Sequence, residues 1–273
     1  MNIVSLFFQL NGDLKSINDL SENEIFQIEK KIKLEKKINP DAIDNTTAVN
    51  LIHVLKNYKS SFYVICNTRL LFNFLTGDYH LRSLFADTIE NQNFDEIHFV
   101  IEEYLLEDLK NNLRKKLADY EFEDIEQLIE HKELFPFSFM AFVKVKLFEK
   151  TSLMINRYSN NTYSTKDLQA LYNPNLYQSL NHFSSPESDD VMNDLINVTS
   201  NFYNANNFQK NNKLIMKCMV NYHSFSPQVS EIINQNAKIA SKEVKKESSS
   251  SFHWGYIWFA IMLIRAIIKC SNT

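Results

Sequence analysis

The residues most able to do chemistry in this chain are its seven histidines and one short run that combines an acid, an imidazole and a guanidinium. A metal site on a helix needs two histidines at i, i+3 or i, i+4, or a Glu-x-x-His pair, and the sequence contains neither. We therefore predict no metal and no cofactor, and we interpret each histidine as a surface residue or a satisfied core residue. The run from Asp78 to Arg82 (DYHLR) is more typical of a helix start than of a catalytic cluster.

Glycine and cysteine usage argues against several large classes of enzyme. The 273 residues include three glycines, Gly12, Gly77 and Gly255, which are too scattered to form a P-loop, a dinucleotide-binding turn or a nucleophile elbow. The three cysteines form neither a CxxC motif nor an obvious disulfide framework, which fits a reducing compartment. Cys66 and Cys218 lie in apolar contexts, so we expect both to be inert core thiols.

A run of acidic residues between Glu121 and Glu133 (EFEDIEQLIEHKE) predicts a helix with one carboxylate-rich face. A solvated helix face is the ordinary interpretation, and a surface for a basic protein partner is the alternative. The chain has 29 Lys+Arg against 33 Asp+Glu, a net charge of −4, so we predict no nucleic-acid partner. The residues expected on the partner surface are Glu121, Glu123, Asp124, Glu126 and Glu130.

The strongest single feature is the apolar stretch from Phe252 to Cys270 (FHWGYIWFAIMLIRAIIKC). Its 19 residues compare with the roughly 20 that a helix needs to cross the hydrocarbon core of a bilayer. Aromatic side chains cluster at its start and cationic side chains near its end, as at the two lipid interfaces of a spanning helix. We predict a transmembrane helix that acts as a tail anchor, with a buried core helix and an interfacial helix as alternatives. The expected anchor residues are Trp254, Tyr256, Trp258, Arg265 and Lys269.

Lysines that precede this stretch set its expected orientation. Residues 238–247 hold four lysines and two glutamates, so the positive-inside rule predicts a single-pass protein with its N-terminal body in the cytoplasm. We expect a bacterial inner membrane rather than a eukaryotic organelle. Without Arg265 and Lys269 the Lys+Arg total falls from 29 to 27 against 33 Asp+Glu, a charge of −6. The body therefore has no net attraction for an anionic bilayer, and residues 252–270 must contact the lipid.

Elsewhere the apolar residues recur with a helical period almost throughout. Ser21 and Glu24 form a capping-box pattern, and two Ser-Pro pairs place a serine N-cap before a first-position proline. Ser61 to Cys66 (SFYVIC) resembles a strand, but an isolated strand has no partner. We therefore predict an all-α fold, a helical bundle or irregular helical array with a C-terminal single transmembrane helix. The predicted helices begin at Ser21 and after Asp44, cover residues 94–118, Ile125 to Ile129 and Phe139 to Ile155, and begin again at Ser185-Pro186 and Ser226-Pro227. The segment from Phe139 to Ile155 is apolar enough to predict a central, largely buried helix.

Composition predicts where the helical body divides. Residues 158–185 are rich in Asn, Ser and Tyr and have weak periodicity, which indicates a linker-like segment. It would separate an N-terminal helical unit (1–157) from a C-terminal helical unit (186–247). The serines at 248–251 predict a short flexible linker to the anchor at 252–270.

The anchor and the lack of any catalytic or nucleotide-binding motif lead to the first hypothesis. It is a non-enzymatic, tail-anchored helical scaffold with a cytoplasmic domain that recruits or assembles protein partners at a membrane, with self-association left open. The first alternative is an oligomeric membrane-perturbing effector of a toxin or defence system, because an intramembrane Arg265 is a functional candidate. The second alternative is an enzyme with an unrecognised helical active site.

Overall fold

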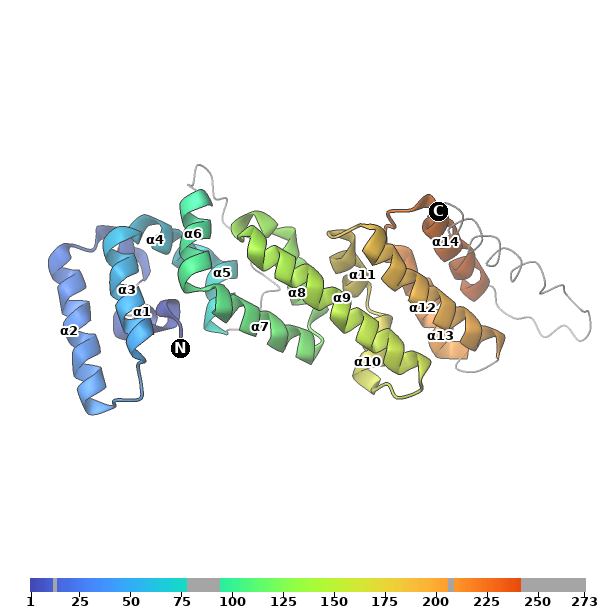
Figure 1. The fold of residues 1–273 in the computed structure, drawn as a ribbon, viewed down its shortest axis with the longest axis horizontal. Helices are drawn as coiled ribbons and strands as arrows, with labels where there is room; N and C mark the ends of the chain where they lie inside the picture. The colour runs from blue at the N-terminus through green and yellow to red at the C-terminus, as the bar shows by residue number, and fades with distance from the viewer. Residues whose placement is uncertain (12–13, 78–93, 206–208, 242–273) are drawn as a thin grey trace, which may run out of the picture. The chain divides into compact units, whose positions relative to one another are not determined.

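The computed structural model describes residues 1–11, 14–77, 94–205 and 209–241 (Figure 1). Within these residues the chain forms α-helices and short 3-10 helices and no strand, which confirms the all-α prediction. Met1–Ala240 form one compact unit. The α-helices are α1 (Ile3–Asn11), α2 (Glu22–Ile38), α3 (Asn45–Asn57), α4 (Lys59–Asn67), α5 (Arg69–Thr76), α6 (Phe94–Tyr104), α7 (Leu106–Asp119), α8 (Phe122–Glu130), α9 (Phe137–Ser159), α10 (Thr165–Leu171), α11 (Pro174–Asn181), α12 (Pro186–Asn204), α13 (Gln209–Cys218) and α14 (Pro227–Ser241); the 3-10 helices are η1 (Leu14–Asp19), η3 (Lys132–Leu134) and η4 (Met219–Asn221).

A single cluster of buried apolar side chains includes residues from all of these α-helices. On α9, Phe139, Val143 and Leu147 recur every four residues, so they line one face of the helix and are fully buried. Burial of each such side chain contributes about 1.5–3 kcal/mol. The opposite face differs from the prediction of a largely buried helix, because Val145 and Leu153 are exposed. α9 therefore has one face in the core and another that presents side chains to solvent.

Three predicted helix starts are confirmed by their capping geometry. Ser21 accepts a hydrogen bond from the backbone N–H of Glu24, whose carboxylate accepts one from the N–H of Ser21, so the capping box closes at the start of α2. The side chain of Asp44 caps α3. Ser185 caps α12, with Pro186 in the first position. Local sequence signals thus account for these three helix starts.

The long helix predicted over residues 94–118 is two helices, α6 and α7, which meet at Leu105. This residue has φ −132° and ψ −7°, outside the helical region, and is fully buried. Its N–H bonds to the carbonyl of Ile101 at 3.0 Å, and its own carbonyl accepts from the N–H of Leu109 at 3.0 Å. Hydrogen bonding continues through the bend and no Gly or Pro marks it, which is why the periodicity predicts one helix.

The segment predicted as a strand, Ser61 to Cys66, is helical and belongs to α4. Its buried residues include Ser61, Phe62, Ile65 and Cys66, and these positions share one side of a helix. β-Branched and aromatic residues favour strands locally, but that preference is weak and depends on packing. Here α4 packs against η1 and α6, and these contacts decide the conformation.

The segment predicted as linker-like, residues 158–185, contains α10 and α11. Both helices begin at a capping side chain, Ser164 for α10 and Asn173 for α11, and both have buried apolar residues. Helices of seven and eight residues make about two turns, so too few apolar repeats exist to reveal them in the sequence. The segment is therefore folded and packed, while the division of the body into two units at this point stays a prediction.

Several predicted features lie outside the described residues. They are the run at 78–82, the end of the body at 242–247, the linker at 248–251 and the anchor at 252–270 with its aromatic and cationic residues. Among the helices that the structure describes, none combines the length and the apolar character needed to cross a bilayer.

Candidate interaction surfaces

The predicted acidic run folds as α8, and its carboxylates divide between two environments. The apolar face of α8 packs against α11 and α7. Glu123, Glu126 and Glu130 recur at i, i+3 and i+7, so they follow one another along another face of the helix. The first two are half-buried and the third is exposed. We call these three residues the acidic stripe.

The other two carboxylates, those of Asp124 and Glu121, bind Lys116 of α7. The Lys116 side chain is 1% exposed, and its Nζ lies 2.6 Å from Oε2 of Glu121 and contacts Oδ2 of Asp124. Asp124 is itself buried, so it does not lie on a surface open to a partner. The sequence gives no sign of this, because the lysine belongs to the preceding helix. A turn at Tyr120, with φ 65°, brings α7 and α8 together.

Glu126 is the carboxylate of the acidic stripe whose pKa is shifted from its ordinary value. Its side chain is 17% exposed. Burial, followed by repulsion from Glu130 one turn along α8, raises the pKa of Glu126 to about 7. His182 Nε2 lies 4.0 Å from Oε1 of Glu126, but burial lowers the pKa of His182, which weakens it as a counter-charge. Near neutral pH, Glu126 is therefore divided between its charged and neutral forms.

A second surface, on α7 and α9, combines cations with an aromatic ring. The ring centre of Phe142 lies 5.6 Å from Nζ of Lys110 and 4.9 Å from the guanidinium carbon of Arg114. Nζ of Lys146, one turn along α9, lies 5.8 Å from the same ring centre. Such cation–π contacts contribute about 0.5–1 kcal/mol each when exposed. We call Lys110, Arg114, Phe142, Lys146 and Lys150 the basic-aromatic face.

The cations of this face differ in their ion pairs. Lys110 pairs with Glu107 at 2.8 Å, and Lys146 pairs with Glu149 at 2.7 Å. Both carboxylates are exposed, at 71% and 57%, so these pairs are weak and screened by solvent. Within the described residues Arg114 forms no ion pair. The basic-aromatic face therefore keeps cationic character at its surface.

Lys150, one turn beyond Lys146, lies over the ring of Tyr120. Its Nζ is 3.5 Å from the ring centre, and within the part of the chain that the structure describes it forms no ion pair with a carboxylate. Burial lowers the pKa of Lys150 by more than the nearby carboxylate of Asp167 raises it. The ammonium is thus held by a π-face rather than by an anion.

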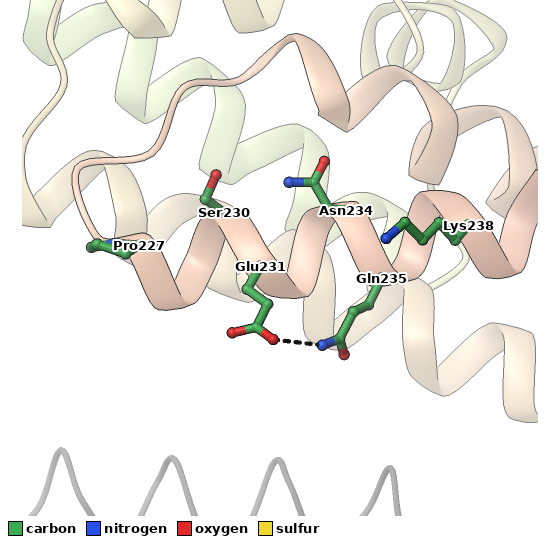
Figure 2. A pocket seen from close by; sticks show the side chains of 6 residues that line it. All are labelled: Pro227, Ser230, Glu231, Asn234, Gln235 and Lys238. Atoms are coloured by element: carbon green, nitrogen blue, oxygen red, sulfur yellow. Dashed lines mark hydrogen bonds between the residues drawn. The ribbon is translucent and has the colours of Figure 1, made fainter.

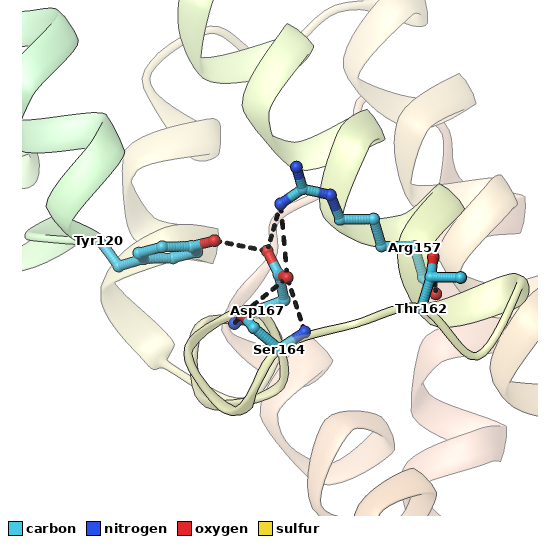
Figure 3. Close-up of polar contacts among 5 residues, drawn as sticks. All are labelled: Tyr120, Arg157, Thr162, Ser164 and Asp167. Carbon is cyan, nitrogen blue, oxygen red and sulfur yellow. Dashed lines mark hydrogen bonds and ion pairs between the residues drawn. The ribbon is translucent and has the colours of Figure 1, made fainter.

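A polar network fixes the position of that ring (Figure 3). Asp167, whose side chain is 1% exposed, accepts a hydrogen bond from the hydroxyl of Tyr120 at 2.6 Å and two more from the N–H and hydroxyl of Ser164 at 2.9 and 2.8 Å. Nη1 of Arg157 lies 3.4 Å from the same carboxylate. Burial acts to raise the pKa of Asp167, but the bonds from Tyr120 and Ser164 outweigh it and hold that pKa below the ordinary 3.8. The network joins the end of α7 to α9 and α10, so it holds the Tyr120 ring in place beneath Lys150.

The basic-aromatic face is not predicted from the sequence, because the apolar character of residues 139–155 indicates a largely buried helix. A signal was present: Phe142, Lys146 and Lys150 recur every four residues, and Lys110 and Arg114 have the same spacing on the helix before. What the spacing does not reveal is that the two helices pack side by side. Only this packing brings both sets of cations to one ring.

The two cysteines predicted as core thiols differ in burial. Cys66 is buried, and burial raises the pKa of its thiol well above the ordinary value. Burial also raises the pKa of the half-buried Cys218 to about 11, and its thiol donates to the carbonyl of Tyr172 at 3.1 Å. Both are therefore protonated near neutral pH and poor nucleophiles. In the described parts of the chain, no three His, Cys, Asp or Glu side chains are grouped so as to hold a metal ion.

A surface hollow of about 500 Å³ lies along the outward side of α14 (Figure 2). Glu231 and Gln235, one turn apart, are hydrogen-bonded there at 3.1 Å. A ligand site normally gathers polar groups from several elements. The described residues of this hollow come from one helix, so we assign no site to it. They are Pro227, Ser230, Glu231, Asn234, Gln235 and Lys238.

Comparison with known protein families, with characterised proteins and with solved structures gives no match to this chain.

Proposed function

We propose that this chain is a membrane-attached helical protein whose body recruits or assembles protein partners at a bilayer. The proposed attachment is residues 252–270, with the aromatic end of the segment at one lipid interface and the cationic end at the other. The proposal gives the body a binding role and no catalytic one. The lysines of residues 238–247 favour a cytoplasmic body, and a bacterial inner membrane is the proposed location.

The observation that carries the binding role is the basic-aromatic face. Aromatic and arginine side chains are enriched at the centres of protein interfaces, and here Arg114 lies over the ring of Phe142. The acidic stripe on α8 adds a surface of opposite charge, and both belong to the unit formed by Met1–Ala240. Two surfaces of different chemistry on one unit support a protein that brings partners together.

Membrane fractionation tests the attachment. The full-length protein is compared with a variant that ends at Ser250, each with a carbonate wash of the membranes. We expect the full-length protein to stay in the washed membrane and the shortened protein to be released. Release of both proteins would contradict the membrane part of the proposal.

Cross-linking in intact membranes tests the binding role. Arg114→Glu with Lys146→Glu reverses two charges of the basic-aromatic face. Lys30→Glu with Lys33→Glu, on exposed positions of α2, makes the same change in net charge and is the control. We expect the natural protein and the control to give the same cross-linked proteins and the first variant to lose them. Identical patterns from all three would show that this face binds no partner.

A second candidate function, a membrane-perturbing oligomer, is favoured by one feature of the sequence. Arg265 directly follows the run from Trp254 to Ile264, which is apolar apart from Gly255. An arginine inside a bilayer either lines an opening or extends to the interface. If it lines an opening, expression of the protein depolarises cells and Arg265→Leu abolishes the effect. If it extends to the interface, the substitution is nearly silent.

A further inference from the structure

The basic-aromatic face holds more positive charge than its own helices neutralise. Lys110, Arg114 and Lys146 all lie within 6 Å of the centre of one ring, so three positive charges are gathered around it and repel one another. Within the described residues neither Arg114 nor Lys150 forms an ion pair, although Glu107 lies near Arg114 and Asp167 near Lys150. Arg114 donates to the side-chain oxygen of Asn111 at 2.5 Å. A surface that supplies carboxylates here would gain attraction that the single chain lacks.

The acidic stripe has the complementary arrangement. Glu126 and Glu130 are carboxylates one turn apart on α8, and burial, followed by repulsion from Glu130, disfavours the charged form of Glu126. These two residues are one helical turn apart, as are Lys146 and Lys150 on α9. Both pairs therefore have the same rise along their helices, about 6 Å. Opposite charge and equal spacing allow each carboxylate to face one ammonium group.

We propose that the acidic stripe of one copy of this chain docks on the basic-aromatic face of a second copy. The ring of Phe142 supplies the apolar centre of the contact, and the carboxylates of Glu126 and Glu130 approach the cations around it. Opposite charges arranged across an interface speed association and fix the register of the contact. The inference rests on the proposed function, because it names the first partner that the body assembles.

The proposed contact joins two different surfaces, so it is heterologous. Each copy in a pair keeps one unused stripe and one unused face, and further copies can add until a ring closes or a filament grows. Salt screens such contacts, so assembly is expected to weaken as ionic strength rises. A contact between identical surfaces would stop at two copies, which gives the experiment a clear readout.

The experiment measures the mass of the full-length protein in a mild non-ionic detergent by light scattering during gel filtration. At an ionic strength of about 50 mM we expect mass to rise with concentration beyond two copies, and at about 500 mM we expect mostly single copies. Arg114→Glu with Lys146→Glu spoils the face, and Glu126→Gln with Glu130→Gln spoils the stripe. Each variant alone is expected to stay a single copy, with a dissociation constant raised about tenfold or more. Lys30→Glu with Lys33→Glu is the matched control and is expected to assemble like the natural protein.

Mixing the two spoiled variants is the decisive step. One retains an intact face and the other an intact stripe, so the mixture is expected to form pairs that stop at two copies. Circular dichroism of each variant confirms that its helices are intact before mixing. A mixture that stays as single copies, although the natural protein assembles, would overturn the proposal.

Three other results would also overturn it. The first is a natural protein that remains a single copy at low salt. The second is assembly that both spoiled variants retain, which would place the contact on another surface. The third is a single-copy protein that binds anionic vesicles through Arg114 and Lys146, which would assign the face to lipid. Membrane retention and cross-linking to other proteins do not depend on a second copy, so failure here leaves the proposed function standing.

Discussion

Two lysines on neighbouring helices, Lys116 and Lys150, occupy contrasting environments. Lys116 is 1% exposed and is neutralised by Glu121 and by the buried Asp124. Lys150 is half-buried and lies over the ring of Tyr120, with no carboxylate bound to it among the described residues. The first cation is therefore compensated inside the fold, whereas the second lies against a ring and is one of the cations that the proposed docking would use.

The contrast teaches that the sign of a charged residue says little about its use. Removing one partner of a buried ion pair leaves the other charge without compensation, so the effect appears in stability. A charge held at a surface contributes little to stability and much to the choice and rate of binding. Substitutions at the buried pair should therefore change stability most, and a substitution at Lys150 should change it least.

The largest effect is expected from Lys116→Met. The substitution leaves Asp124 buried without its cation and should lower the free energy of unfolding by about 3–5 kcal/mol. Urea unfolding followed by circular dichroism measures the change. The double variant with Asp124→Leu removes both charges and should recover most of the loss, because apolar pairs of similar size tolerate this exchange. A single variant as stable as the natural protein would mean that Lys116 is not required to compensate Asp124.

Helix starts and the all-α class could be predicted from the sequence because they depend on neighbouring residues. Ser21 and Ser185 cap their helices through bonds to residues three positions away, so the pattern is visible in a short window. The burial of Asp124 and its ion pair with Lys116 could not be predicted in this way. Its partner is eight residues distant on another helix, across a turn that depends on the positive φ of Tyr120.

The next effect is expected from Asp167→Asn. An amide cannot accept all the hydrogen bonds that Tyr120, Ser164 and Arg157 direct at the carboxylate. The free energy of unfolding should therefore fall by about 2 kcal/mol. The folded-state pKa of Asp167 is below the ordinary 3.8, so its contribution is complete above that value and is lost as pH falls through the folded pKa. Stability measured from neutral to acidic pH should therefore fall less steeply in the variant. An unchanged slope would contradict the role given to this carboxylate.

The basic-aromatic face shows why a surface is harder to predict than a core. Phe142, Lys146 and Lys150 follow one another along one side of α9. Periodicity alone does not show whether that side of the helix is buried or exposed. The neighbouring helix α7 decides the outcome, because its cations meet the same ring. Contacts between helices cannot be predicted from a local sequence pattern. The basic-aromatic face is therefore identified only from the folded structure.

A smaller and pH-dependent effect is expected from Glu126→Gln. The pKa of Glu126 is raised from 4.5 to about 7, so the folded chain binds a proton that the unfolded chain releases across this interval. The natural protein therefore loses stability as pH rises from 4.5 to about 7, and the loss is complete above that. The variant cannot ionise and should be more stable by about 1 kcal/mol at alkaline pH, with no gain at acidic pH. Thermal unfolding across this range measures the difference, and a gain at acidic pH would contradict the cause.

The smallest change in stability is expected from Lys150→Met, which completes the comparison of the two lysines. Methionine keeps the length and the contact with Tyr120, so the free energy of unfolding should change by less than about 1 kcal/mol. Loss of the ammonium should nevertheless raise the dissociation constant between copies by about threefold to tenfold at low salt. Urea unfolding measures the change in the free energy of unfolding, and light scattering on the same protein measures the change in the dissociation constant. A stability loss as large as that of Lys116→Met, with unchanged assembly, would reverse the roles assigned to the two lysines.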